Sequence, residues 1–173
     1  MKGMIKLRNI LSEILQEITP LFQDISKYNG IPSDTMYDFG GSGYVSVYPE
    51  SEGIENIIVV DLEDPYIDDP EDKNIYFIKG DLFTPVNLPT QAKEIQISKL
   101  IRYAGDKEDI VIDNIDKHLI KGGIVRIFED SDEDDNYDSL MLRLIEKFKS
   151  KGYSVVKTDS FNYGDVELAI LKK

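Results

Sequence analysis

The sequence predicts a single α/β domain whose mostly parallel sheet ends in an antiparallel hairpin. From Met36 onward, short apolar runs alternate with helical patterns, as in βα units that build a parallel sheet. The last two apolar runs, 154–158 and 166–171, are separated by a loop too short for a crossover helix, so these strands must pair antiparallel. The 173 residues suffice for one domain with a continuous core, and no linker-like segment divides them.

A helical segment, residues 1–30, is expected to precede the α/β core, residues 35–173. Apolar residues recur at helical spacing over 7–18, which predicts a first amphipathic helix. Thr19-Pro20 has the form of an N-cap followed by a first-turn proline, and predicts a second short helix that runs to about Tyr28.

Seven short runs rich in β-branched and aromatic residues are the strand candidates: 36–39, 57–61, 75–78, 94–97, 124–128, 154–158 and 166–171. Two helices are expected among them. The first, about 107–120, is opened by Asp106 and closed by Gly122-Gly123. The second, about 137–150, carries a clean amphipathic stripe and ends before Gly152.

The net charge of −13 is local. Segments 61–73 and 129–138 each hold seven acidic residues, and the remainder of the chain is close to neutral. Duplex nucleic acid is therefore a poor partner, because affinity for it comes from basic groups that release counterions. A small or cationic substrate, or a basic protein, remains compatible with this charge.

The composition excludes several chemistries. Because the chain contains no cysteine, disulfides, thiolate zinc sites and a cysteine nucleophile are ruled out. No apolar run approaches the roughly 20 residues that span a bilayer, and the first residues do not form a secretory signal, so we expect a cytoplasmic protein without membrane contact. His118, the one histidine, falls late on a predicted helix and is expected to complement its dipole or lie on the surface rather than act as a base.

The most informative stretch is Asp38-Phe39-Gly40-Gly41-Ser42-Gly43-Tyr44, with Asp61 at the tip of the next strand. Glycines after a first strand let the backbone turn tightly and approach a ligand closely. An acid about 20 residues further on can accept hydrogen bonds from both ribose hydroxyls of a nucleoside. This logic applies equally to NAD and to S-adenosylmethionine.

The rest of the chain resembles the class I S-adenosylmethionine-dependent methyltransferases over roughly residues 35–173. Residues 38–44 resemble the first motif of that family, and residues 56–62 resemble its second strand with the ribose acid. Tyr76-Phe77-Ile78-Lys79-Gly80-Asp81-Leu82-Phe83 resembles the third strand, where an acid meets the adenine amino group. Residues 119–125 are similar to the Leu-Lys-Pro-Gly-Gly turn before the fifth strand, and 151–153 to the entry of the terminal hairpin.

The resemblance implies a Rossmann-like sheet of seven strands with the last strand antiparallel, in one methyltransferase-like domain over 1–173. It implies S-adenosylmethionine as cofactor and methyl transfer to an unidentified acceptor. The cofactor-binding residues it implies are Asp38, Gly40, Gly41, Gly43, Asp61, Asp81 and Leu82. It places the fourth motif near residues 97–100 and assigns no catalytic side chain. Ser98 and Lys99 are expected to cap the strand and lie in solvent, with substrate contact by one of them as the alternative.

Two alternatives remain open. The family's glycine loop usually reads Asp-x-Gly-x-Gly-x-Gly, whereas here Ser42 and Tyr44 occupy later glycine positions or the loop is one residue shorter. This departure is compatible with a catalytically inactive methyltransferase-fold module for binding or assembly. The second alternative is an NAD-dependent oxidoreductase that uses the same glycines and Asp61, although the terminal hairpin argues against it.

The acidic run 129–135 also has a bearing on ligands. Asp130, Asp132 and Asp134 have the alternate spacing of a calcium loop, but Asp135 stands at the glycine position and Met141 where the bidentate glutamate belongs, so no metal is expected. Both acidic segments follow predicted strands at the carboxyl edge of the sheet. They are expected to frame a negatively charged mouth suited to a cationic acceptor.

Overall fold

The computed structural model describes residues 23–40, 51–63, 74–130, 137–160 and 165–173. Its strands are β1 (Thr35–Phe39), β2 (Asn56–Asp61), β3 (Asn74–Lys79), β4 (Ala92–Ser98), β5 (Leu119–Asp130), β6 (Tyr153–Ser160) and β7 (Asp165–Lys172). Its helices are η1 (Ile25–Lys27), η2 (Pro32–Asp34), η3 (Ile101–Tyr103), η4 (Gly105–Lys107), α2 (Glu108–His118) and α3 (Tyr137–Ser150), where η marks a short 3₁₀ turn.

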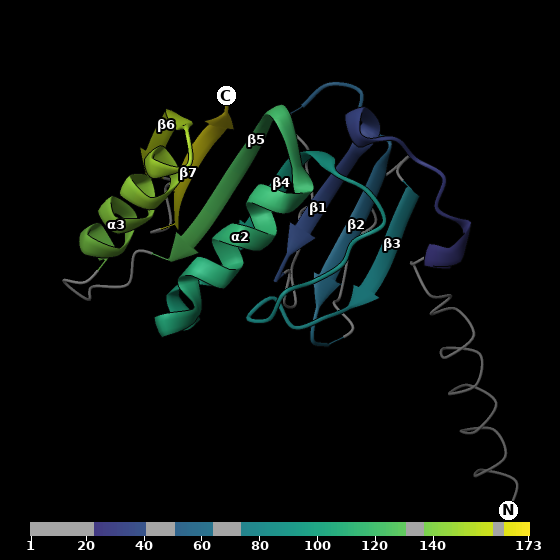
Figure 1. Ribbon diagram of the computed structural model, residues 1–173, viewed down its shortest axis with the longest axis horizontal. Coiled ribbons are helices and arrows are strands. Elements are labelled where there is room, and N and C mark those ends of the chain that lie inside the picture. Colours follow the sequence, from purple (N-terminus) through teal and green to yellow (C-terminus); the bar gives the residue numbers. More distant parts are fainter. Residues whose placement is uncertain (1–22, 41–50, 64–73, 131–136, 161–164) are drawn as a thin grey trace, which may run out of the picture.

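The seven strands form one sheet in the order β3-β2-β1-β4-β5-β7-β6 (Figure 1). Neighbouring strands from β3 across to β5 run parallel, and β7 is antiparallel to both β5 and β6. Each strand predicted from the sequence lies within an observed strand, and the predicted terminal hairpin is present. The predicted fold class is confirmed.

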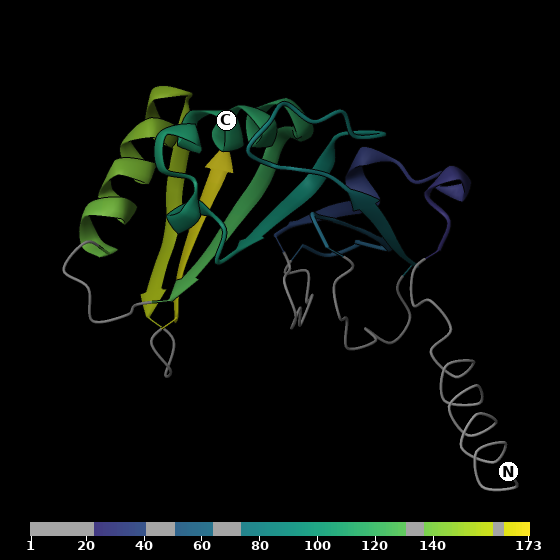
Figure 2. The ribbon, with the colours of Figure 1, turned by 90° about the horizontal axis from the view of Figure 1, so that it is seen from below.

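The two faces of the sheet carry separate apolar clusters. Alternate residues of β1 and β2, such as Tyr37 and Ile58, pack into the larger cluster together with Val111 of α2 and Phe148 of α3. Both α2 and α3 lie on this face (Figure 2). The opposite face of β1–β3 has a smaller cluster, which includes Met36, Ile57, Val59 and Ile75. All four apolar side chains of 57–60 are inaccessible, as expected for a central strand covered on both faces.

The prediction for α3 is confirmed at both ends, and the helix predicted over about 107–120 is present as α2, but the capping residues predicted for α2 are wrong at both ends. The first turn of α2 has Lys107 at the N-cap position without a side-chain cap, while Asp106 lies in the preceding turn η4. The helix ends at His118, and β5 begins at the next residue.

Gly122 and Gly123 therefore lie inside β5, where they form an irregularity rather than a helix cap. Between the pairs Ala92–Leu119 and Glu94–Ile124, β5 gains extra residues over β4. Gly122 has φ +79°, and a Cβ on Gly123 would lie 2.8 Å from the Lys93 carbonyl oxygen. The glycines are needed because the backbone bulges and two main chains meet closely there.

The second N-terminal helix is wrong in its described part, residues 23–28. Gln23 forms an isolated parallel bridge to Tyr76 of β3, and its N–H donates to the Ile75 carbonyl at 2.6 Å. Asp24 has an extended backbone and caps the three-residue turn η1. The pairing with the sheet edge outcompetes a continuous helix. The helix predicted over 7–18 lies outside the described residues. In the described part of the chain, no helix is both long and apolar enough to span a membrane.

Candidate functional site

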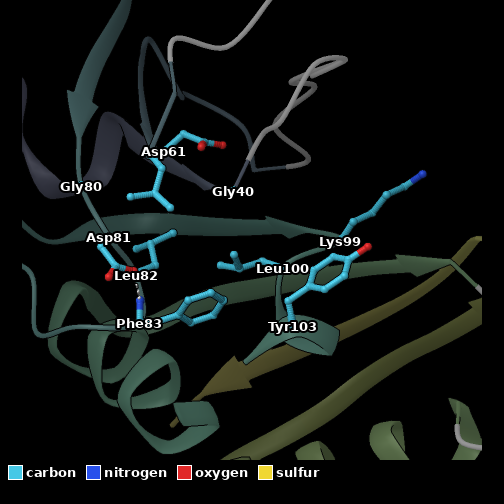
Figure 3. A pocket seen from close by; sticks show the side chains of 10 residues that line it. Gly40, Asp61, Gly80, Asp81, Leu82, Phe83, Lys99, Leu100 and Tyr103 are labelled. Carbon is cyan, nitrogen blue, oxygen red and sulfur yellow. Dashed lines mark hydrogen bonds between the residues drawn. The ribbon is translucent and has the colours of Figure 1, made fainter. Parts of the chain in front are cut away.

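A hollow of about 140 Å³ lies at the carboxyl ends of β1–β4. Gly40 contributes from the tip of β1, and Asp61 and Leu62 contribute from β2. One side, which we call the β3 wall, is made by residues 80–83; the other, the β4 wall, is made by Leu100 and Tyr103. Figure 3 shows the two walls with Asp61 near the top of the view. In a parallel α/β sheet this edge is where ligands bind.

Four of the seven residues implied as cofactor-binding line this hollow together: Gly40, Asp61, Asp81 and Leu82. Asp38 does not line it. Gly41 and Gly43 lie outside the described residues. Of the two substrate candidates at the end of β4, Lys99 lines the hollow and Ser98 does not. Lys99 has φ +53°, a left-handed conformation that a non-glycine residue seldom adopts.

Short local turns fix the two carboxylates of the hollow. Asp61 Oδ1 accepts a hydrogen bond from the Glu63 N–H at 3.2 Å, and Asp81 Oδ1 accepts one from the Phe83 N–H at 2.9 Å. In each case the carboxylate bonds to the backbone two residues later, which is a common turn former. The second oxygen of each carboxylate is the atom suited to a ligand's hydroxyl or amino group.

Apolar groups form most of the remaining surface. Leu82 is almost fully buried, while Leu62 and Tyr103 at the mouth are 54% and 70% exposed. Exposed large apolar side chains beside a hollow are the kind of surface that stacks on a flat ligand. The arrangement thus combines two hydrogen-bonding acids with apolar contacts, which suits a nucleoside.

Gly40 is required by its backbone and by its neighbour. Its φ is +73°, and a Cβ built there would lie 3.0 Å from the Cβ of Leu100. The tip of β1 and the β4 wall therefore approach one another with no space for a side chain between them.

Asp38 lies two residues earlier on β1 and is completely buried, and among the described residues neither of its carboxylate oxygens has a hydrogen-bond partner. Burial, reinforced by the nearby charge of Asp61, raises the pKa of Asp38 from 3.8 to about 8. A buried acid without a partner is costly unless a cation or a donor is supplied to it.

The β3 wall is held by a buried side chain that the sequence analysis did not single out, Asn114 of α2. Its amide nitrogen donates to the carbonyls of Leu82 at 3.0 Å and Thr84 at 2.8 Å, and its oxygen accepts from the Val86 N–H at 3.1 Å. The segment after β3 contains no helix, so its main-chain groups lack the hydrogen bonds that a helix would provide, and Asn114 supplies partners to three of them. An asparagine in an amphipathic helix gives no sequence signal for this role.

His118 also links α2 to the segment after β3. It is not the surface residue that the sequence analysis allowed for. It is buried on α2; its Nδ1 lies 2.8 Å from the Asn114 carbonyl, and its Nε2 accepts from the Leu88 N–H at 3.4 Å. Because a carbonyl can only accept, Nδ1 carries the proton and the ring is neutral. Burial lowers the pKa of His118, which agrees with this structural role.

Within the described ranges, no group of three or more histidine, aspartate or glutamate side chains is arranged to hold a metal ion. Asp132 and Asp134 of the calcium-like pattern lie outside those ranges.

The strand order, the antiparallel β7 and a hollow at the carboxyl ends of the parallel strands are the features of the class I S-adenosylmethionine-dependent methyltransferase fold. Among solved structures, the chain is similar to the glycopeptide N-methyltransferase MtfA complexed with S-adenosyl-L-methionine (TM-score 0.59, 10% identity, covering 94% of this chain and 92% of that chain). It is also similar to the N-methyltransferase NodS from Bradyrhizobium japonicum in complex with S-adenosyl-L-homocysteine (0.51, 12%, 92% and 85%).

A third similar structure is the Methanococcus jannaschii fibrillarin pre-rRNA processing protein (TM-score 0.57, 16% identity, covering 82% of this chain and 67% of that chain). No protein-family model matches the sequence, and no curated protein matches it significantly. At these identities the likeness establishes the fold alone.

Proposed function

We propose that this protein binds S-adenosylmethionine in the hollow at the ends of β1–β4 and transfers its methyl group to an acceptor. The observation that carries the proposal is the convergence of Gly40, Asp61, Asp81 and Leu82 on one hollow. These residues come from three separate strand ends. Two of the similar solved structures hold S-adenosylmethionine or S-adenosylhomocysteine, which supports the choice of ligand.

The chemistry of the side chains fits the parts of this cofactor. Asp61 would accept hydrogen bonds from the ribose hydroxyls, and Asp81 would accept one from the adenine amino group. Leu62 and Leu82 would pack against the base. Asp38 lies behind the tip of β1 as a buried acid without a partner, so it would favour the positive charge of the methionyl amino group or the sulfonium. Gly40 lines the hollow and has no side chain, so its main chain would contact the methionyl part of the cofactor directly.

The bound cofactor supplies an electrophilic methyl carbon on a sulfonium. Its methyl carbon would pass to a lone pair of the acceptor, with the carbon–sulfur electron pair returning to sulfur and the acceptor's proton leaving to water. This chain's residues would hold the two reactants in line, and positioning of this kind can account for a large part of a rate enhancement.

Calorimetric titration with S-adenosylmethionine, S-adenosylhomocysteine and NAD tests the proposal. We expect the first two to bind and NAD not to bind. Asp61→Asn should weaken both by about 10- to 100-fold, since charge-assisted hydrogen bonds contribute about 1.5–3 kcal/mol. Glu63→Gln is the matched control, because Glu63 is an exposed acid two residues away that does not line the hollow.

The alternatives predict different titrations. A binding or assembly module would bind none of the three ligands, and an oxidoreductase would bind NAD. Unchanged affinity in Asp61→Asn would remove the ribose assignment even if S-adenosylmethionine binds.

We further propose that the acceptor is a small cationic molecule. Segments 61–73 and 129–138 each carry seven acids and begin at the carboxyl ends of β2 and β5, the edge that holds the hollow. Labelled methyl transfer from S-adenosylmethionine to polyamines, neutral amines and polylysine tests this. Preference for polyamines, weakened by salt, supports it; preference for polylysine would indicate a basic protein, and preference for neutral amines would refute it.

A further inference from the structure

Two glutamates of the described chain, Glu94 and Glu129, are completely inaccessible to solvent. Glu129 lies near the end of β5 and does not line the hollow. Its carboxylate accepts a hydrogen bond from the main-chain N–H of Ile101 at 2.8 Å and another from Nε of Arg102 at 3.2 Å. Burial raises the pKa of Glu129, while these donors oppose the increase. The buried carboxylate thus depends for its hydrogen bonds on another segment, residues 101–102.

Those partners belong to η3, the turn that follows β4. Leu100 stands at its N-cap and provides no side-chain hydrogen bond to the N–H groups that begin the turn. Glu129, 28 residues away in sequence, fills that role. A turn whose first N–H loses its acceptor in a buried position loses about 1–3 kcal/mol and its fixed geometry.

The position of η3 determines the shape of the hollow. Leu100 and Tyr103 form the β4 wall (Figure 3). Leu100 also lies against Gly40 so closely that a Cβ there would be 3.0 Å from the Leu100 Cβ. A displaced η3 would therefore alter the wall and also the contact that restrains the first residue of the glycine loop.

We propose that Glu129 is a positioning residue: it anchors η3 and, through Leu100, holds Gly40 and the β4 wall in the geometry that the ligand requires. The effect on ligand affinity rests on the proposed function, but the anchoring of η3 does not. No contact between Glu129 and the ligand is involved.

Glu129→Gln keeps the size of the side chain but removes its charge and turns one acceptor into a donor. By NMR, we expect the amide hydrogens of Ile101 and Arg102 to exchange at least 10-fold faster relative to the slowest core amides. Calorimetry should give about 10-fold weaker binding of S-adenosylhomocysteine. Unchanged local exchange would overturn the proposal.

Glu94→Gln is the matched control. Glu94 is equally buried, accepts a hydrogen bond from the Ser51 N–H at 2.8 Å and is paired with an arginine, Arg126, at 3.5 Å, but none of these three residues lines the hollow. We expect this variant to lose stability without selective exchange at 101–102 and without a matching loss of affinity. If both variants behave alike, Glu129 is merely structural and the proposal fails.

Two further outcomes are separable. If the unaltered protein does not bind S-adenosylhomocysteine, the proposed function fails, and the exchange measurement still decides whether Glu129 anchors η3. If Glu129→Gln does not fold, Arg102→Gln removes the side-chain bond from Nε to Glu129 and leaves the Ile101 bond; it should increase exchange at Ile101 by a smaller factor, and no increase would count against the proposal.

Discussion

Among the described residues, buried polar side chains are hydrogen-bonded in the walls of the hollow but not at the tip of β1. In the walls, Asn114 bonds to three main-chain groups of the segment after β3, and Glu129 bonds to η3. At the tip of β1, Asp38 is equally buried, and the part of the chain that the structure describes offers no partner to either carboxylate oxygen.

This difference separates what folding completes from what it leaves for a ligand. Fully bonded anchors make the walls rigid before a ligand arrives, and such preorganisation limits the cost of binding. An unpartnered acid lowers stability and is retained where a bound group can satisfy it. The contrast predicts that changes to wall anchors reduce stability, whereas removing the Asp38 charge increases stability and reduces affinity.

The largest expected effect is the pH dependence that Asp38 imposes. Its pKa is about 8 in the folded protein against 3.8 ordinarily, so between these values the folded state holds a proton that the unfolded chain has released. Stability should therefore fall as pH rises from about 4 to 8, by up to about 1.4 kcal/mol per pH unit. Urea unfolding from pH 5 to 9 measures this, and the slope should be smaller in Asp38→Asn.

The same variant tests the other half of the contrast. At pH 8 or above, Asp38→Asn should be more stable than the unaltered protein yet bind S-adenosylmethionine at least 10-fold more weakly. A cationic ligand should also release a proton from Asp38 near pH 7, which calorimetry in buffers of different ionisation enthalpy detects. Equal proton release in both proteins would show that the proton does not come from Asp38 and would contradict its assigned role in binding.

Removal of the β3 wall's anchor should have the next largest effect. Asn114→Leu has a similar volume but leaves two carbonyls and one N–H without their partner, at a cost of about 3 kcal/mol in the free energy of unfolding. Asp113→Asn is the control on the same helix; it removes only a solvent-exposed ion pair with Lys151 and should cost less than about 1 kcal/mol. Similar losses in both variants would contradict the assigned role of Asn114.

Gly40→Ala should cost about 2 kcal/mol, because it combines a left-handed φ with a close contact to Leu100. Leu100→Ala in the same chain should recover the part of the cost that comes from the contact. A double-mutant cycle by urea unfolding separates the two contributions. Strictly additive losses in the free energy of unfolding would mean that there is no steric interaction between residues 40 and 100.

Much of the fold could be predicted from the sequence because it depends on local patterns. The period of α3 and the bare apolar run of β2 were sufficient to place both elements. The errors came where tertiary contacts decide. Gly122 and Gly123 have the form of a helix stop, but a bulge between neighbouring strands requires them. Residues 23–28 resemble a helix, but pairing with β3 prevails.

The site divides in the same way. Gly40, Asp61, Asp81 and Leu82 follow strand ends in a recognisable order, so the sequence could bring them together. Asn114 and Glu129 act on segments about 30 residues away through main-chain atoms, which carry no side-chain signature. Tyr103 likewise lines the hollow from η3, a turn of three residues that is too short to leave a periodic pattern in the sequence.

The smallest expected effect on stability compares a buried and an exposed side chain of α2 that both bond to the segment after β3. Lys117 also holds the segment after β3, since its Nζ donates to the Val86 carbonyl at 3.1 Å and to Asn87 Oδ1 at 2.8 Å, but both bonds are exposed to solvent. Water can replace them, so Lys117→Gln should change the free energy of unfolding by no more than about 0.5 kcal/mol. A loss as large as that of Asn114→Leu would mean that the number of bonds, rather than their burial, fixes the β3 wall.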